Sequence, residues 1–153
     1  EAVARYAAET LRHAEDGPEF RLELPSADFV QIIEGVSHFV YVATRAAQDR
    51  AATALEMEMQ AEVDKWILLA GDIESLDVER STQLRERLFE KVEYSHAPES
   101  ELGQRYRVAN RTALRFVRRL ERTHLATRRY GELRRELNEF FRSGQEEKLR
   151  RAE

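Results

Sequence analysis

The sequence has no cysteine, only three prolines and six glycines, and no long apolar run. The absence of cysteine excludes disulfide bonds, thiolate nucleophiles and thiolate metal ligands. So few glycines and prolines argue against an all-β protein, which needs many tight turns. Without a run of roughly 18 apolar residues or the apolar core of a signal peptide, we expect a soluble, cytoplasmic protein that does not enter a membrane. Because the chain does not begin with methionine, a leader or a further domain could precede it.

What the sequence does contain is typical of helices. Hydrophobic residues make up 42% of the chain and charged residues 35%, and the commonest types are the helix formers Ala, Arg, Glu and Leu. The length is that of one domain, which we expect to span residues 1–153 and to bury a sizeable core. The sequence therefore predicts a single all-α domain.

The charge changes sign along the chain. Residues 1–104 hold 10 Lys or Arg and 22 Asp or Glu, whereas residues 105–135 hold 11 Arg and only Glu121 and Glu132. The last 18 residues are nearly neutral. Such a chain either neutralises itself by packing acidic helices against a basic one or presents the basic surface to an anionic partner.

Apolar periodicity predicts two long helices, at residues 28–70 and 99–143. In the first helix, apolar residues recur every three or four positions. Alanine lines its middle from Ala43 to Ala54, and Gly71 ends it. The second begins at the Pro98-Glu-Ser-Glu sequence and ends near Gly144. Each is long for a globular protein, which favours coiled-coil-like packing. The predicted inward residues of the first helix begin with Phe29, Ile33, Val36, Val40, Ala43 and Ala47.

Two shorter helices are predicted at residues 2–15 and 78–95, with an extended connector at 16–25 and a charged tail at 145–153 that frays. The resulting fold class is an all-α elongated helical bundle, in which the shorter helices cover the apolar stripes of the long ones.

These lengths predict self-association. The helix at 78–95 is only about half as long as its neighbours, so the end of the last long helix has no partner within the chain. Apolar residues there would pair with another subunit. Alternatively, Gly131 breaks the helix and the end folds back. We favour a homodimer whose contacts include Leu133, Leu137, Phe140 and Phe141.

An arginine stripe lies on the second long helix, almost opposite the apolar face. Its like charges at i,i+4 spacing destabilise an isolated helix, and guanidinium groups suit phosphate. One interpretation is a surface that binds the phosphate backbone of a nucleic acid. The other is neutralisation by an acidic protein surface, from residues 56–64 or from Glu86, Glu90 and Glu93. The stripe consists of Arg107, Arg111, Arg115, Arg118, Arg122 and Arg129.

Two Glu-x-x-His pairs, Glu93 with His96 and Glu121 with His124, have the spacing found in carboxylate-bridged di-metal bundles. Glu34 or Glu62 could supply further ligands. The first pair sits at a helix end, and Arg122 lies within the second, so we treat all four as weak candidates and expect no metal. His124 fits a hydrogen-bonded core histidine.

No Gly-rich phosphate loop or nucleophile elbow accompanies these residues, so we expect no enzyme and no cofactor. The favoured function is a non-catalytic scaffold, adaptor or assembly subunit that acts through protein association, most of all with itself. The alternatives are a nucleic-acid-associated subunit and a carboxylate and histidine di-metal bundle.

Overall fold

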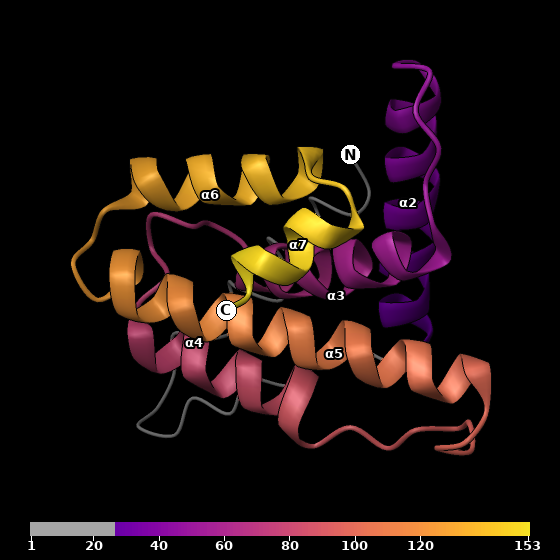
Figure 1. Cartoon of the computed structure of the whole chain (residues 1–153). Helices are drawn as coiled ribbons and strands as arrows, with labels where there is room; N and C mark the ends of the chain where they lie inside the picture. The colour runs from indigo at the N-terminus through magenta and orange to yellow at the C-terminus, as the bar shows by residue number, and fades with distance from the viewer. Residues whose placement is uncertain (1–26) are drawn as a thin grey trace.

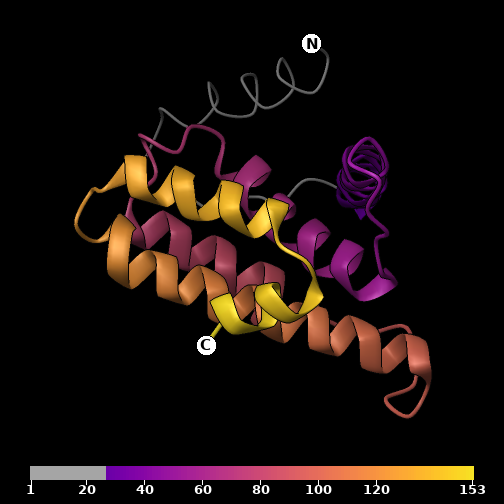
Figure 2. The ribbon, with the colours of Figure 1, turned by 45° about the horizontal axis from the view of Figure 1, so that its top comes forward.

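The computed structural model describes residues 27–153, which form six α-helices and no strand, so the predicted all-α class is confirmed for this part of the chain. The helix predicted at 2–15 and the connector predicted at 16–25 lie outside the described residues. In Figure 1, α3 to α7 stack together and α2 stands at one edge of the stack. Figure 2 shows α2 nearly end-on beside the other helices.

The first predicted long helix is wrong, because it is two helices, α2 (Ala27–Ala46) and α3 (Ala54–Ala70). The helix starts again at Thr53, whose side chain accepts the backbone N–H of Glu56 while the Glu56 carboxylate accepts the backbone N–H of Thr53. This reciprocal capping satisfies N–H groups that a helix start leaves free. In the turn between the helices, Asp49 adopts a left-handed φ of 52°.

The predicted helix at 78–95 is shorter than expected. It consists of α4 (Val78–Arg85), capped by Asp77, and a π-helical turn at Glu86–Glu90 (η1). Residues 91–100 then form an irregular connection to α5. Here Pro98 marks the start of the next helix rather than the end of the previous one.

The second predicted long helix is also broken. It consists of α5 (Glu101–Leu120), a π-helical turn at Glu121–Leu125 (η2) and α6 (Tyr130–Arg142). The break is at Arg128, with a left-handed φ of 54°, and not at Gly131, which lies within α6. Figure 1 shows that α6 runs back antiparallel to α5.

This reversal places the C-terminal apolar residues in the core of the same chain. Leu133, Leu137 and Phe140 are buried, and the Phe140 ring stacks on that of Phe116 with centroids 4.2 Å apart. Phe141 is half-buried and meets the Tyr41 ring edge-on at 5.5 Å. The predicted self-association surface is therefore wrong, since these residues already have partners within the chain.

The last residues do not fray. They form α7 (Gln145–Arg151), whose Lys148 is fully buried although the sequence predicted a charged, exposed tail. The core that α3 to α7 enclose contains the fully buried Trp66 together with aliphatic and aromatic side chains from every one of these helices.

The buried face of α2 differs from the predicted one. The helix packs mainly on α3 and buries Ile33, Ser37, Tyr41 and Arg45. Most of the predicted inward stripe is exposed instead. The exposed members are Val36, Val40, Ala43 and Ala47.

Candidate functional site

The arginine stripe is only partly free. Arg107 donates to the backbone oxygens of His96 at 3.3 Å and Gly103 at 2.9 Å, and its guanidinium lies 4.4 Å from the centre of the Tyr94 ring. These contacts tie the start of α5 to the connection that precedes it. Arg107 is therefore a structural residue of this connection.

Acidic side chains neutralise two further members. Arg118 contacts the Glu90 carboxylate at 3.0 Å, which confirms Glu90 as an acidic partner, and Arg129 contacts Glu132 at 3.2 Å. Arg129 lies beyond the helix break, so it does not continue the stripe. Arg111, Arg115 and Arg122 remain exposed, and the described residues offer them no ion pair.

The two Glu-x-x-His pairs do not form one site. Glu93 and His96 lie in the irregular connection, where the His96 ring stacks on Tyr106. Glu121 is buried far from them, accepting hydrogen bonds from Ser81 at 2.7 Å and from Arg85 at 2.9 Å.

Glu121 therefore joins α4 to η2 through an ion pair. Its partner Arg85 also contacts Glu90. His124 is half-buried, and its Nδ1 has no hydrogen-bond partner among the described residues. At this nitrogen, the structure does not show the hydrogen bond that we predicted for a core histidine.

A buried polar junction, which the sequence did not predict, joins α2, the start of α3 and the start of α7. The hydroxyl of the fully buried Tyr41 donates to the backbone oxygen of Ser143 at 3.1 Å. The Glu56 carboxylate accepts the backbone N–H of Gln145 at 2.7 Å and lies 3.5 Å from the Arg45 guanidinium. Burial and the Glu56 charge raise the pKa of Tyr41 to about 12.

The Lys148 ammonium is enclosed next to this junction. It donates to Gln60 Oε1 and to the backbone oxygen of Phe140, both at 2.6 Å, and faces the rings of Tyr41 and Phe140. Burial lowers the pKa of Lys148 to about 7, although the nearby carboxylates of Asp64 and Glu56 act in the opposite direction.

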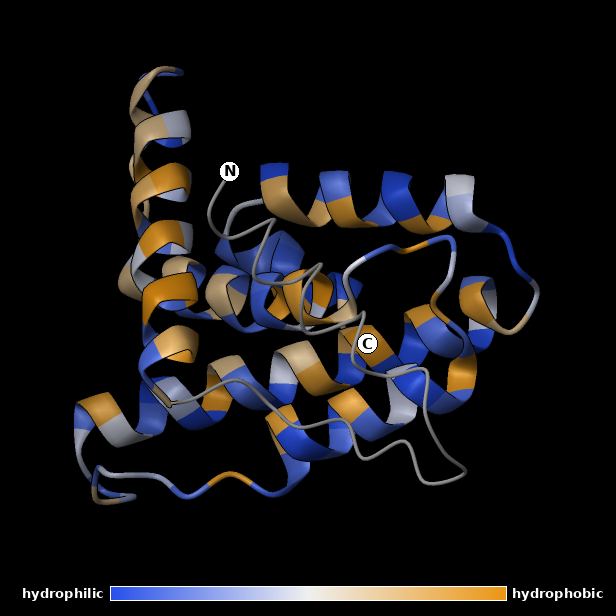
Figure 3. Cartoon of the chain, turned by 180° about the vertical axis from the view of Figure 1, so that it is seen from behind, coloured by the Kyte–Doolittle hydropathy of each residue, from blue (hydrophilic) through white to orange (hydrophobic). Residues whose placement is uncertain are grey.

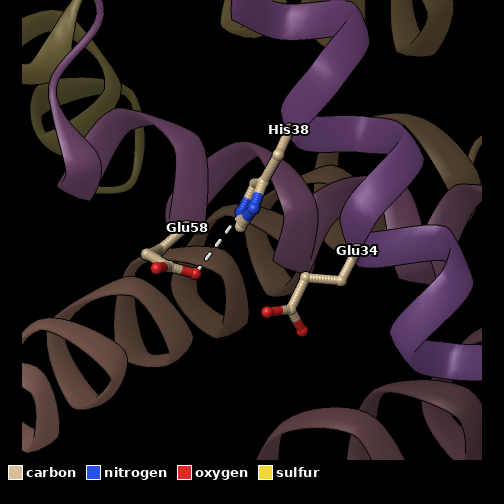
Figure 4. A group of neighbouring side chains, drawn as sticks. All are labelled: Glu34, His38 and Glu58. Carbon is tan, nitrogen blue, oxygen red and sulfur yellow. Dashed lines mark ion pairs between the residues drawn. The ribbon is translucent and has the colours of Figure 1, made fainter.

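A second polar cluster lies between α2 and α3 and consists of Glu34, His38 and Glu58. Each residue offers one ligand atom, and these atoms all lie within 4.8 Å of one another. Glu34 and His38 are one turn apart on α2, and Glu58 faces them from α3 (Figure 4). His38 Nε2 lies 3.4 Å from a Glu58 oxygen.

Basic side chains border the cluster without closing it. Lys65 contacts Glu62 at 2.8 Å and lies 3.9 Å from Glu34, while Arg105 Nε lies 3.7 Å from Glu58. Burial raises the pKa of Glu58 against the opposing effect of His38. The cluster thus brings two carboxylates and one imidazole together, with a basic side chain beside each carboxylate.

The outer face of α2 is apolar and uncovered by any described helix. The exposed side chains include Phe39, at 74% of its full accessibility, and Ile32 and Val36, each above half. In Figure 3 the ribbon of α2 is hydrophobic along much of its length although it stands at the edge of the molecule. Exposed apolar surface of this extent marks an interaction site.

The sequence held part of these signals. Thr53 and Glu56 match the Ser/Thr-x-x-Glu capping pattern, a signal for a new helix start that the prediction of one continuous helix missed. Glu34 and His38 have the i,i+4 spacing of paired ligands, but no local pattern connects them to Glu58. Nothing local distinguishes Lys148 from an exposed lysine.

A scan against protein-family models finds no match, and searches of curated proteins and of solved structures find none either. Within residues 27–153, no helix combines the length and the apolarity needed to cross a bilayer.

Proposed function

We propose that this protein is a non-catalytic assembly module in which two copies pair through the outer face of α2. The observation that carries the proposal is an exposed helix face that carries no charged residue from Ile32 to Ala46. A solvated helix face normally carries charged side chains. A face without them favours an apolar partner over an anionic one.

The spacing of this face fits another helix. Successive positions are separated by three and four residues, which is the seam of a coiled-coil pair. We call these residues the α2 seam. They are Ile32, Val36, Phe39, Ala43 and Ala46.

The shape of the α2 seam supports a second copy as the partner. Its large side chains lie in the first half of the helix and its small ones in the second half. Two antiparallel copies centred on Phe39 would place Ile32 opposite Ala46 and Val36 near Ala43, so each of these large residues meets a small one, while the two Phe39 side chains meet at the two-fold axis. A two-fold pair of this kind is closed, because the same patch is used by both copies.

Phe39→Glu is expected to abolish the dimer, because it places two carboxylates beside the two-fold axis. We expect the dissociation constant to rise by about 30-fold or more, which corresponds to an interface residue worth about 2 kcal/mol. Light scattering after size-exclusion chromatography measures the change. Leu68→Glu, at an exposed apolar site on α3, is the matched control and should leave the dimer intact. A wild-type monomer at high micromolar concentration would contradict the proposal.

The orientation can be tested by cross-linking, because the chain contains no cysteine of its own. Phe39→Cys should form a disulfide-linked dimer on oxidation. Ile32→Cys alone should not, whereas a mixture of Ile32→Cys and Ala46→Cys chains should cross-link. Efficient self-linking of Ile32→Cys would indicate parallel helices instead. If no variant cross-links to a second copy but the chain forms a complex with another protein, the α2 seam binds that protein instead.

A second candidate function is binding to the phosphate backbone of a nucleic acid. Its support is the exposed trio Arg111, Arg115 and Arg122, which has no ion pair within the described residues. Binding of duplex DNA or RNA should weaken steeply as salt rises. Reversing these three charges should weaken it further, while reversing Arg134, which pairs with Glu74, should matter less. Fluorescence anisotropy that detects no binding at low salt would exclude this function.

A further inference from the structure

We infer that Glu34, His38 and Glu58 form a binding site for one divalent first-row transition-metal ion, for which Zn²⁺ is the reference. Imidazole nitrogen and carboxylate oxygen are ligands that such ions accept. Three protein ligands leave a fourth position for water.

The geometry is close to that of an occupied site. Ligands about 2.1 Å from a tetrahedral ion lie about 3.4 Å apart. His38 Nε2 and the Glu58 oxygen already have a separation of 3.4 Å, and Glu34 completes the set within 4.8 Å. Glu34 has to approach by about 1 Å, which a half-exposed side chain achieves by rotation. Figure 4 shows the three side chains converging from two helices.

An independent observation is the lack of hydrogen bonds at this place. Glu58 is only 6% exposed, and its contacts are the ion pairs with His38 at 3.4 Å and Arg105 at 3.7 Å. His38 Nε2 and Glu62 Oε2 are buried without hydrogen-bond partners among the described residues. Buried polar atoms are nearly always satisfied, so a group of unsatisfied atoms indicates a missing water or ion.

The charges balance around a divalent ion. Glu34 and Glu58 carry two negative charges, and neutral His38 adds none. Lys65 keeps Glu62 as its partner at 2.8 Å, and Arg105 keeps Glu101 at 4.0 Å. Binding therefore leaves no uncompensated charge, and the partly exposed Glu34 and His38 side chains provide access from solvent.

The site and the α2 seam are separate surfaces of the same helix. Glu34 and His38 lie next to the face that packs on α3, whereas Phe39 points to the opposite side. Metal binding is therefore expected to survive Phe39→Glu. The failure of one proposal does not entail the failure of the other.

The test is calorimetric titration of ZnCl₂ into the chelator-treated full chain at pH 7.5. We expect one equivalent to bind, and His38→Ala or Glu58→Gln to weaken binding by about tenfold or more. Binding should also weaken in acid, because protons compete with the metal ion for its ligands. His96→Ala with Glu93→Gln is the matched control and should bind as the wild type does.

Two further measurements distinguish loss of the site from misfolding of a variant and from non-specific binding of Zn²⁺ at the surface. Glu34→Gln changes a half-exposed residue and should weaken Zn²⁺ while the circular dichroism spectrum stays unchanged. Co²⁺ should show the visible absorption of a site of low coordination number in the wild type and lose it in His38→Ala. No saturable Zn²⁺ binding, or equal binding by the wild type and His38→Ala, would overturn the inference and leave an ordinary ion pair of His38 with Glu58.

Discussion

Glu56→Ala is expected to lower the free energy of unfolding by about 3 to 5 kcal/mol, because it leaves a buried cation without its carboxylate. Glu56 is buried and bonds the backbone N–H groups of Thr53 and Gln145. Its removal frees the start of α3 and the start of α7 together. It also leaves the buried guanidinium of Arg45 with only the backbone oxygen of Ala51 as an acceptor.

Urea denaturation followed by circular dichroism measures this loss. Glu56→Gln keeps an acceptor oxygen and should cost less than the alanine variant. Glu86→Ala is the matched control, since its half-exposed carboxylate lies 4.0 Å from Lys91 and should contribute no more than about 1 kcal/mol. An alanine variant of Glu56 as stable as that control would show that the junction contributes little.

Stability is expected to rise by about 3 kcal/mol between pH 7 and pH 9.5, and Lys148 is the cause. Its pKa is about 7 in the folded chain, against 10.5 for an ordinary lysine. Between these values the unfolded chain binds one proton more than the folded chain. Stability therefore increases with pH by at most about 1.4 kcal/mol per unit. Below pH 7 both states are protonated, and this contribution no longer changes.

Above pH 10 the trend reverses. The pKa of Tyr41 is raised to about 12 from an ordinary value of 10, so the unfolded chain loses this proton first and stability falls again. Chemical denaturation across pH 7 to 11 should therefore show a maximum near pH 10.

Lys148→Met is the variant that isolates the lysine, because it keeps an unbranched side chain and removes the titrating group. The difference in unfolding free energy between the wild type and this variant should change with pH between 7 and 9.5, while contributions from other groups cancel. A difference that is constant with pH would mean that Lys148 stays charged in the folded protein through its bonds to Gln60 and Phe140.

Local chemistry predicted several helix boundaries well. α3 ends at Gly71, which adopts φ 74°, and α5 starts after Pro98 with Ser100 as its cap. α6 ends one residue before Ser143. A Gly at a helix end and Ser at a helix start act through their own backbone and side chains, so sequence suffices.

The two breaks were missed for different reasons. The first has a readable cap at Thr53 and Glu56, but the alanine repeat around it is equally compatible with a continuous helix. At the second, a left-handed Arg128 replaces the expected glycine. Such a conformation costs energy locally and persists only because the packing of α6 on the core compensates for it.

The break between α2 and α3 decides which residues form the α2 seam and the Glu34, His38 and Glu58 cluster. α2 is apolar on two faces, so its sequence alone could not decide whether Val36 or Tyr41 is buried. The turn at 47–53 brings α3 against the Tyr41 face and leaves Val36 outside. The same turn brings Glu58 to Glu34 and His38, which no periodicity could pair.

By itself, the sequence determined that the chain is helical, where α2, α4 and α5 begin, where α3 and α6 end, and that one helix carries clustered arginines. Those properties depend on backbone propensity and on neighbours three or four residues apart. The tertiary structure decided which apolar face is core, which carboxylates meet a cation or a histidine, and that Lys148 is enclosed. Such outcomes depend on contacts between distant segments, where the free energy of burying a whole surface outweighs local preference.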